Sequence, residues 1–470
     1  MVKPLPWWLG PAVVGLALRL AGALKLRPWH DEYFTNWVAG LPWKQLFDAL
    51  RWDSGPPLPY VLAKLGSLAG LHPLFVARGV SVLAGVGAVV FFGKAAAIAF
   101  SPPAGGMAAW LFAVHPLAVM WGSEGRAYSL LSLGVALSFW AAARLHAAQS
   151  RWLPLAGGLA FTLYTHALGL LVVGATVAAG WRRARRAALW AALVALVLFA
   201  PWIPVMLAQP PEAMGWVESW RERLSLLAFG PWRLLPPLAP WGATLEAPVP
   251  PAWVQGLAAA TTLVALPWEA SWVWWLVAIP TAGLLGGAAL GVPVFFPGRG
   301  EAVFLGPFLG LLARGATSWR KLLLAILVAC GLGGSLWVVQ SWGEAGPRPE
   351  VLLAKRLLQE ADRGLVVTTG WWWLDLRANL PGGWEVVHLP RAAERHPGWY
   401  LPGKEKPAPE ELAALGERIR QVRQQGLPVA FVLAPGLAES QKASALAAEA
   451  GAFPAGQVAG GELWVAPGTR

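Results

Sequence analysis

The stretch WWLGPAVVGLALRLAGALKLRPWHDEYF, residues 7–34, joins a long apolar run to an acidic pair. Residues 7–26 suffice for one bilayer crossing, which needs roughly 20 apolar residues. No convincing small-residue cleavage site follows, so we expect an uncleaved first transmembrane helix, with a cleaved signal peptide as the alternative. Asp31 and Glu32 come directly after this run, between aromatic residues. Their position beside the membrane is the first indication of function.

The composition indicates a polytopic membrane protein. The chain is 56% hydrophobic and 13% charged, against about 25% charged residues in a soluble domain. Its mean hydropathy is +0.51, and it contains 31 tryptophans, which favour membrane–water interfaces. The net charge of +12 does not indicate nucleic acid, because the basic residues are scattered or lie beside apolar runs. Cys330 is the single cysteine, which excludes an intrachain disulfide and a cysteine-based metal site.

The hydropathy pattern predicts about eleven crossings. The stretch 152–181 is too long for one helix, so we divide it at YTHALG (164–169) into two shorter spans. Residues 56–71 are too short for a crossing and are expected to form a half-helix or interfacial segment. The remaining expected spans are 7–26, 74–97, 102–121, 126–146, 187–208, 251–268, 270–295, 301–316 and 321–340.

The distribution of lysine and arginine predicts the orientation. The basic clusters WRRARR (181–186) and SWRK (318–321) favour the cytoplasmic side. We therefore expect a multi-pass protein of the cell (inner or plasma) membrane with a cytoplasmic N-terminus and an extracytoplasmic C-terminus. The segments expected on the outer face are the loop with Asp31, the turn 123–128, His166, the proline-rich loop 209–250 and Arg299.

The first outer loop carries its own helical pattern. Apolar residues recur at i, i+3, i+4 and i+7 over 34–41 and again over 43–50, with Pro42 between them. This periodicity predicts two short amphipathic helices on the membrane surface. They would hold Asp31 and Asp53 near the lipid headgroups.

The composition changes after about residue 341. Helical and strand patterns then alternate, which predicts a small α/β domain with a partly parallel sheet. We therefore expect a transmembrane domain over 1–341 and an extracytoplasmic α/β domain over 342–470. No glycine-rich phosphate loop and no internal repeat occur, so the tail is expected to be an accessory domain that covers or docks a partner surface.

Asp31 and Glu32 are the leading candidates for chemistry, because charged groups near a bilayer are costly and mark function. One interpretation is that they only cap the following helix, since acidic residues favour helix N-termini. The other is that Asp31 is a catalytic base, which takes a proton from an acceptor while that acceptor attacks a sugar carbon. Capping explains a single acid but not an adjacent buried pair.

Two further motifs are polar. In RWDSGPPLPY (51–60), Asp53 is compatible with a plain turn or with binding of a metal or substrate. In SEGRAYSLL (123–131), Glu124 and Tyr128 share a helix face, and the planar fork of Arg126 suits phosphate. The alternative for Arg126 is a snorkelling interfacial arginine.

Three single residues are weaker candidates. His166 lies at a helix break and is compatible with a hydrogen-bonded structural role or with substrate binding. Arg299 precedes a span and is compatible with anchoring or with a second phosphate contact. Arg78, near the outer end of its span, is expected to snorkel.

The motifs together resemble the GT-C superfamily of membrane glycosyltransferases, in the branch of protein O-mannosyltransferases, the lipid A aminoarabinose transferase and bacterial Rgt-like transferases. The resemblance covers about residues 7–340 and depends on the order of the motifs. They are ALRLAGALKLRPWHDEYF, DSGPPLPYVLAKL, SEGRAYSLLSLGVALSFWAAARL, LYTHALGLLV and PGRGEAVFLGPFLGLLARG.

The resemblance implies an enzyme that takes a sugar from a polyprenyl-phosphate-linked donor and passes it to a lipid, glycan or protein acceptor at the outer face. Asp31 matches the family's catalytic acid and Glu32 its common neighbour. Arg126 and Tyr128 match an Arg-x-Tyr motif in which the arginine would hold the donor phosphate. His166 matches a histidine often found at that break.

The loop with Asp53 departs from the family pattern. Asp53 matches the acid before the family's His-Pro-Pro, but Gly55 replaces the histidine. A divalent metal ion is therefore left open, and no other cofactor is expected.

Two other function classes compete with the transferase. A transporter or flippase of lipid-linked sugars would bind phosphate with the same arginines. That hypothesis, however, predicts charged residues along the membrane midplane and an internal repeat. A non-catalytic scaffold predicts that Asp31→Asn is silent. The expected partners are the polyprenyl-phosphate sugar, its acceptor and membrane lipids, without nucleic acid.

Overall fold

The computed structural model divides into two compact units, which we describe separately. One unit comprises Met1–Arg27 with Ser54–Ala345, and the other comprises Pro28–Asp53 with Gly346–Arg470. The residues that the structure describes are 6–53, 55–209, 261–262, 264, 266, 269, 271–290, 292, 298–344, 349–395, 397, 406–458 and 461–468.

The first unit is a helical bundle. Among the described residues, five helical segments of this unit are long and apolar enough to cross a membrane. The described part of the chain contains up to seven such spans if each bent helix pair counts as one. Its elements are α1 (Leu9–Lys25), α4 (Leu58–Leu68), α5 (Pro73–Ala99), α6 (Pro102–Val114), α7 (Pro116–Ser123), α8 (Tyr128–His146), α9 (Leu153–Thr165), α10 (Gly169–Gly180), α11 (Arg185–Phe199), η1 (Ala200–Trp202), α12 (Ile203–Ala208), η3 (Trp272–Trp274), α15 (Trp275–Ala289), η4 (Gly300–Val303), α16 (Leu305–Ala313), η5 (Arg314–Thr317) and α17 (Lys321–Glu344).

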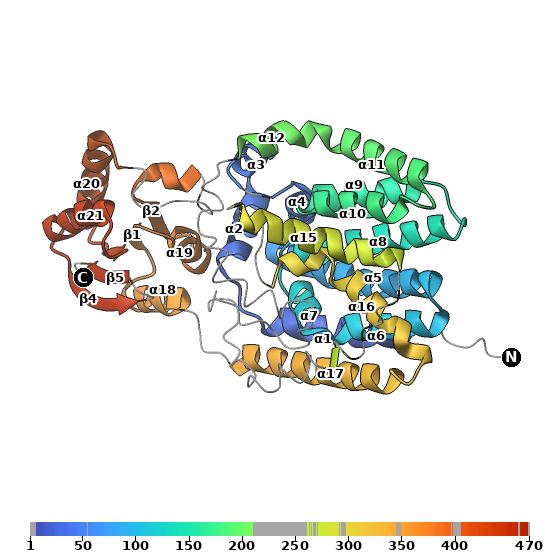
Figure 1. The fold of residues 1–470 in the computed structure, drawn as a ribbon. Helices are drawn as coiled ribbons and strands as arrows, with labels where there is room; N and C mark the ends of the chain where they lie inside the picture. Colours follow the sequence, from blue (N-terminus) through green and yellow to red (C-terminus); the bar gives the residue numbers. More distant parts are fainter. Residues whose placement is uncertain are drawn as a thin grey trace. The chain divides into compact units, whose positions relative to one another are not determined.

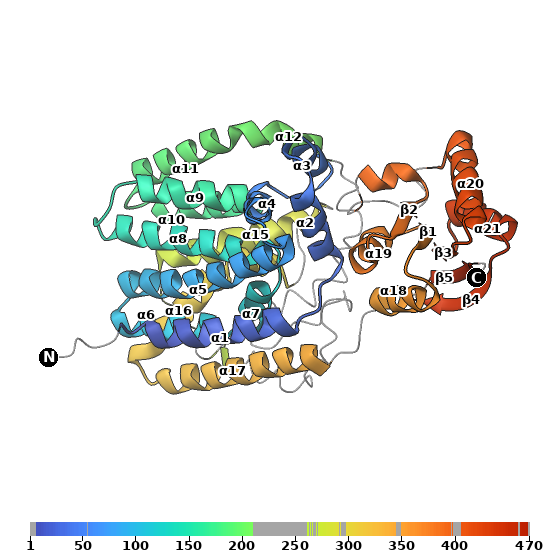
Figure 2. The ribbon, with the colours of Figure 1, turned by 180° about the vertical axis from the view of Figure 1, so that it is seen from behind.

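The long helices of this bundle lie side by side (Figures 1 and 2). Helix α5 packs against α1, α6 and α8, while α9 packs between α8 and α11. The short α4 packs on α5 and has the length expected of a half-helix. These contacts bury a continuous apolar core along α5 and α8.

The expected division near His166 is present, because α9 ends at Thr165 and α10 begins at Gly169. The expected span 102–121 is present as a broken helix: α6 and α7 are long and apolar enough to cross a membrane together, but they are bent by 59°. The reason is Pro116, which has no N–H to donate and disfavours a helical backbone at His115. Of the expected loop 209–250, all but Gln209 lies outside the described residues, as does most of the span 251–268.

The break between α6 and α7 leaves backbone carbonyls that need partners inside the bundle. The Arg19 guanidinium is fully buried and donates to the carbonyls of Ala113 (3.0 Å) and Phe112 (3.4 Å). The Ser335 hydroxyl donates to the carbonyl of Val114 at 2.8 Å. Two residues from α1 and α17 therefore cap the C-terminal end of α6.

Arg78 has a similar role, and the expectation that it snorkels is wrong. Its side chain is buried, and one guanidinium nitrogen donates to the carbonyls of Ala23 (2.7 Å) and Leu26 (2.8 Å). These carbonyls lie at the C-terminal end of α1, where a positive charge is favourable. Arg78 therefore fixes the end of α1 against α5.

The second unit contains a mixed sheet of order β2-β1-β3-β5-β4. Strand β1 is parallel to β2 and β3, whereas β5 is antiparallel to β3 and β4. The elements are α2 (His30–Gly40), α3 (Trp43–Leu50), α18 (Pro349–Glu360), β1 (Gly364–Thr368), α19 (Trp373–Asn379), β2 (Trp384–His388), η6 (Arg391–Arg395), α20 (Pro409–Gln424), β3 (Val429–Leu433), α21 (Ala438–Glu449), β4 (Phe453–Val458) and β5 (Gly461–Ala466).

Successive side chains of a strand point to opposite faces of the sheet and pack into two separate hydrophobic cores, as expected for a sheet covered on both faces. Leu365 of β1 packs with residues of α20 and α21, whereas its neighbour Val366 packs with residues of α18 and α19. The partly parallel α/β domain predicted from the alternating pattern is confirmed. Both amphipathic helices expected in the first loop, α2 and α3, are also present.

Candidate active site

The turn that carries Arg126 links α7 to α8 and is held by α5. The Arg126 amide donates to the carbonyl of Glu124 at 2.9 Å. The Ser81 hydroxyl donates to the Arg126 carbonyl at 3.2 Å, and the Ser129 hydroxyl donates to the Ser81 carbonyl at 2.6 Å. This chain of bonds fixes the backbone around Arg126.

Arg299 reaches the same turn from a distant part of the sequence. Its guanidinium donates to the Tyr128 hydroxyl at 3.2 Å and lies over the Tyr128 ring, 5.2 Å from the centroid. The backbone before Arg299 is fixed as well, because the Trp121 indole donates to the Gly298 carbonyl at 2.7 Å. Gly298 has a φ of +84°, a conformation that favours glycine.

His166 completes this group, in the break between α9 and α10. Its ring centroid lies 5.7 Å from that of Tyr128. Burial and the positive charges of Arg126 and Arg299 lower the pKa of His166 to about 4. The Leu168 amide donates to Nδ1 at 3.2 Å, which requires an unprotonated Nδ1. His166 is therefore neutral at pH 7 and carries its proton on Nε2.

Two buried carboxylates accompany these cations in the same unit. Glu124 is 4% exposed and Glu301, in η4, is 2% exposed. Glu301 was missed from the sequence, although the motif PGRGEAVF places it two residues after Arg299. Charged residues at this density inside an apolar bundle indicate a functional site.

The acids of the first loop lie on α2. Because α2 begins at His30, both Asp31 and Glu32 belong to its first turn, where a negative charge is favourable. The N-cap position is Trp29, without a side-chain capping bond, so neither acid is the N-cap residue. Asp31 is partly exposed, whereas Glu32 is fully buried.

Asp53 is buried at the end of the same loop. It follows α3 in a turn in which its amide approaches the Leu50 carbonyl at 3.3 Å. Helix α4 begins five residues later, at Leu58, after the two prolines. The backbone at Asp53 therefore forms a turn, which is one of the two interpretations of this motif.

The structure thus groups the predicted residues into two sets. Among the residues that it describes, no three histidine, cysteine, aspartate or glutamate side chains gather into a group that could hold a metal ion. The first unit contains Glu124, Arg126, Tyr128, His166 and Arg299, and the second contains Asp31, Glu32 and Asp53.

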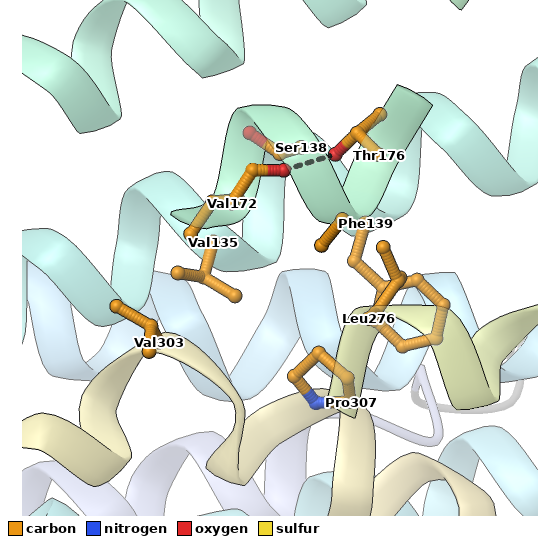
Figure 3. Close-up of a pocket in the computed structure, with 9 residues that line it drawn as sticks. Val135, Ser138, Phe139, Val172, Thr176, Leu276, Val303 and Pro307 are labelled. Carbon is orange, nitrogen blue, oxygen red and sulfur yellow. Dashed lines mark hydrogen bonds between the residues drawn. The ribbon is translucent and has the colours of Figure 1, made fainter. Parts of the chain in front are cut away.

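A small cavity lies deeper in the helical bundle. It has a volume of about 10 Å³ and lies between α8, α10, α15, η4 and the start of α16, and its lining is mostly apolar. Figure 3 shows the hydroxyl of Thr176, which donates to the Val172 carbonyl at 2.8 Å. None of the predicted site residues lines it.

Comparison with known proteins gives a structural match without a sequence match. No protein-family model matches the sequence, and no curated protein resembles it. The fold is similar to that of ArnT, an aminoarabinose transferase from Cupriavidus metallidurans, in a crystal structure with bound undecaprenyl phosphate. The two share 13% identity, and the match covers 98% of each chain with a TM-score of 0.54.

An oligosaccharyltransferase from Archaeoglobus fulgidus, in a crystal structure with zinc and sulfate, is also similar. It is 10% identical, and the match covers 79% of this chain and 61% of that one with a TM-score of 0.47. The full-length match to ArnT shows a similar fold, and this fold agrees with the one implied by the resemblance seen in the motifs. The chain has the fold of the GT-C membrane glycosyltransferases.

Proposed function

We propose that this protein transfers a sugar from a polyprenyl-phosphate-linked donor to a lipid, glycan or protein acceptor at the outer face of the membrane. The observation that carries the proposal is the group formed by Arg126, Tyr128, His166 and Arg299. Two guanidinium groups, a tyrosine and a neutral histidine suit a phosphate ester, because arginine binds phosphate through paired N–H donors. The apolar bundle around them suits a prenyl tail.

In the proposed reaction, the Asp31 carboxylate accepts the proton of the acceptor while the acceptor attacks the anomeric carbon. The bond between that carbon and the phosphate oxygen breaks, and the polyprenyl phosphate leaves with the electron pair. Arg126 holds this phosphate and stabilises the charge that develops on it, with Arg299 as a second contact. Attack opposite to the leaving group inverts the anomeric centre.

Burial favours Asp31 over Glu32 as the base. A base must reach the acceptor, and Asp31 is partly exposed while Glu32 is fully buried. Glu32 is then assigned the role of an acidic neighbour, and Asp53 that of a substrate-side residue.

The test is turnover of a radiolabelled polyprenyl-phosphate sugar by purified protein and by the Asp31→Asn variant. The matched control is Asp48→Asn, since Asp48 is an exposed acid of α3 in the same loop, 3.9 Å from Arg51. Loss of turnover in a normally folded Asp31→Asn variant, with the control unaffected, supports the proposal. Equal turnover in all three proteins refutes the role of Asp31.

A second measurement separates transfer from transport. The dissociation constant for polyprenyl phosphate is measured for the parent and for Arg126→Met. Arg144→Met is the control, because Arg144 donates to the exposed carbonyl of Gln149. Weaker binding in Arg126→Met alone supports the phosphate contact. Movement of the labelled donor across sealed vesicles, without transfer to any acceptor, would favour the transporter instead.

A further inference from the structure

The helix that carries Asp31 packs on the C-terminal α/β domain through one face. His30, Tyr33 and Trp37 occur at i, i+3 and i+7 of α2, so they share a side of the helix. All three contact α19 or the turn before it. The loop 28–53 and the C-terminal residues belong to one compact unit for this reason.

The polar contacts of this interface are short and specific. Nδ1 of His30 lies 2.8 Å from Oδ2 of Asp375, whose side chain is 8% exposed. The Asn379 amide nitrogen donates to the Tyr33 hydroxyl at 3.1 Å and to the Asp375 carbonyl at 2.7 Å. Asn379 thus uses both N–H groups of its amide, one toward α2 and one to fix itself on α19.

Aromatic rings close the interface around these bonds. Trp37 meets Trp373 edge to face, with centroids 6.3 Å apart and planes at 82°. The His30 ring meets Trp371 in the same way, with centroids 6.0 Å apart and planes at 88°. Two aromatic contacts therefore accompany the polar ones, one of them made by the His30 ring itself.

Helix α19 is itself fixed on the sheet. Leu376 and Leu380 lie four residues apart and belong to the core that includes Val366 and Val432. The Trp373 indole donates to the Val386 carbonyl of β2 at 3.0 Å. Asp375 and Asn379, also four residues apart, occupy another side of α19 and so present a rigid pair of polar groups to α2.

We propose that Asp375 and Asn379 are positioning residues for the sugar-transfer reaction, an inference that rests on the function proposed above. The Asp375 carboxylate accepts the Nδ1–H of His30 and fixes the orientation of that ring. His30 opens the first turn of α2, and Asp31 is the next residue. The C-terminal domain therefore sets the position of the base. A displacement of about 1 Å at a reacting group costs on the order of 100-fold in rate.

The experiment uses the full-length protein and the Asp375→Leu/Asn379→Leu double variant. The control is Asp362→Asn, which changes an exposed acid of the same domain. Hydrogen–deuterium exchange over residues 30–40 tests the contact without any substrate. We expect at least about tenfold faster exchange there in the double variant, with exchange in the sheet unchanged and the control like the parent.

Turnover of the radiolabelled donor tests the consequence. We expect kcat of the double variant to fall by about 10- to 100-fold while KM for the donor stays within about twofold, because Asp375 and Asn379 are not assigned to donor binding. Unchanged exchange over 30–40, or faster exchange with an unchanged kcat, would overturn the inference. Absence of turnover in the parent would count against the proposed function instead, and the exchange result would still decide whether α19 holds α2.

Discussion

Replacement of Arg19 by methionine tests how the broken helix α6–α7 is stabilised. Arg19 is fully buried and donates to the carbonyls of Gly15 at 3.0 Å, Ala113 at 3.0 Å and Phe112 at 3.4 Å. The Gly15 carbonyl lies within α1 and keeps its helical environment. The other two carbonyls lie at the end of α6, where no intrahelical donor follows.

The expected magnitude follows from these two carbonyls. Methionine fills a similar length of space but has no donor, so Ala113 and Phe112 lose their side-chain partner inside the bundle. An unsatisfied buried backbone group costs about 1–3 kcal/mol, which gives about 2–6 kcal/mol for the pair. The substitution also removes the buried positive charge of Arg19, whose desolvation is unfavourable, and this offsets part of the loss. We therefore expect the free energy of unfolding to fall by about 2–4 kcal/mol.

The assay is unfolding of the purified protein in detergent by heat and by denaturant. Arg144→Met is the matched control, since Arg144 donates to the exposed carbonyl of Gln149 and its loss should cost less than about 1 kcal/mol. Arg19→Lys should give an intermediate loss, because an ammonium group keeps donors but lacks the planar fork. Equal stability of Arg19→Met and the parent would refute the capping of α6 by Arg19.

Three further results are expected. Tyr128→Phe removes the hydroxyl that accepts a bond from Arg299 at 3.2 Å but keeps the ring, so polyprenyl phosphate should bind about tenfold more weakly, and unaltered affinity would contradict this. The pKa of His166 is lowered to about 4, so the unfolded chain binds a proton between pH 6.5 and 4 that the folded protein excludes. Stability should fall on acidification through that range, and less so in His166→Asn, as thermal unfolding at pH 7 and pH 5 would reveal. A Cβ on Gly122 would lie 2.5 Å from Cδ of Arg19, so Gly122→Ala should destabilise the fold by about 1–3 kcal/mol; unchanged unfolding would argue against this close packing.

The elements of this protein were largely predictable because their signals are local. Apolar runs of sufficient length predicted the long helices, and the 3.6-residue period predicted α2 and α3. The break at Pro116 also has a local signal, the residue pair His115–Pro116. It was not predicted, because residues 102–121 are mostly apolar and were interpreted as one span. Helix α19 was not predicted, since seven residues carry too little periodicity.

The site depends on contacts that no local pattern encodes. Arg299 meets Tyr128 across 171 residues of sequence, and His30 meets Asp375 across 345. The sequence could nominate Arg126, Tyr128, His166 and Arg299 one by one, because charge and polarity are conspicuous in an apolar chain.

By itself, the sequence determined the membrane class, the α/β tail and the residue types able to bind phosphate, since these follow from composition and periodicity. Tertiary structure alone decided which of those residues meet, and it decided that the helix with Asp31 rests on α19. The physical reason is that such contacts arise when whole elements pack face to face. The side chains that pack together are set by the path of the entire chain, which short-range sequence patterns do not specify.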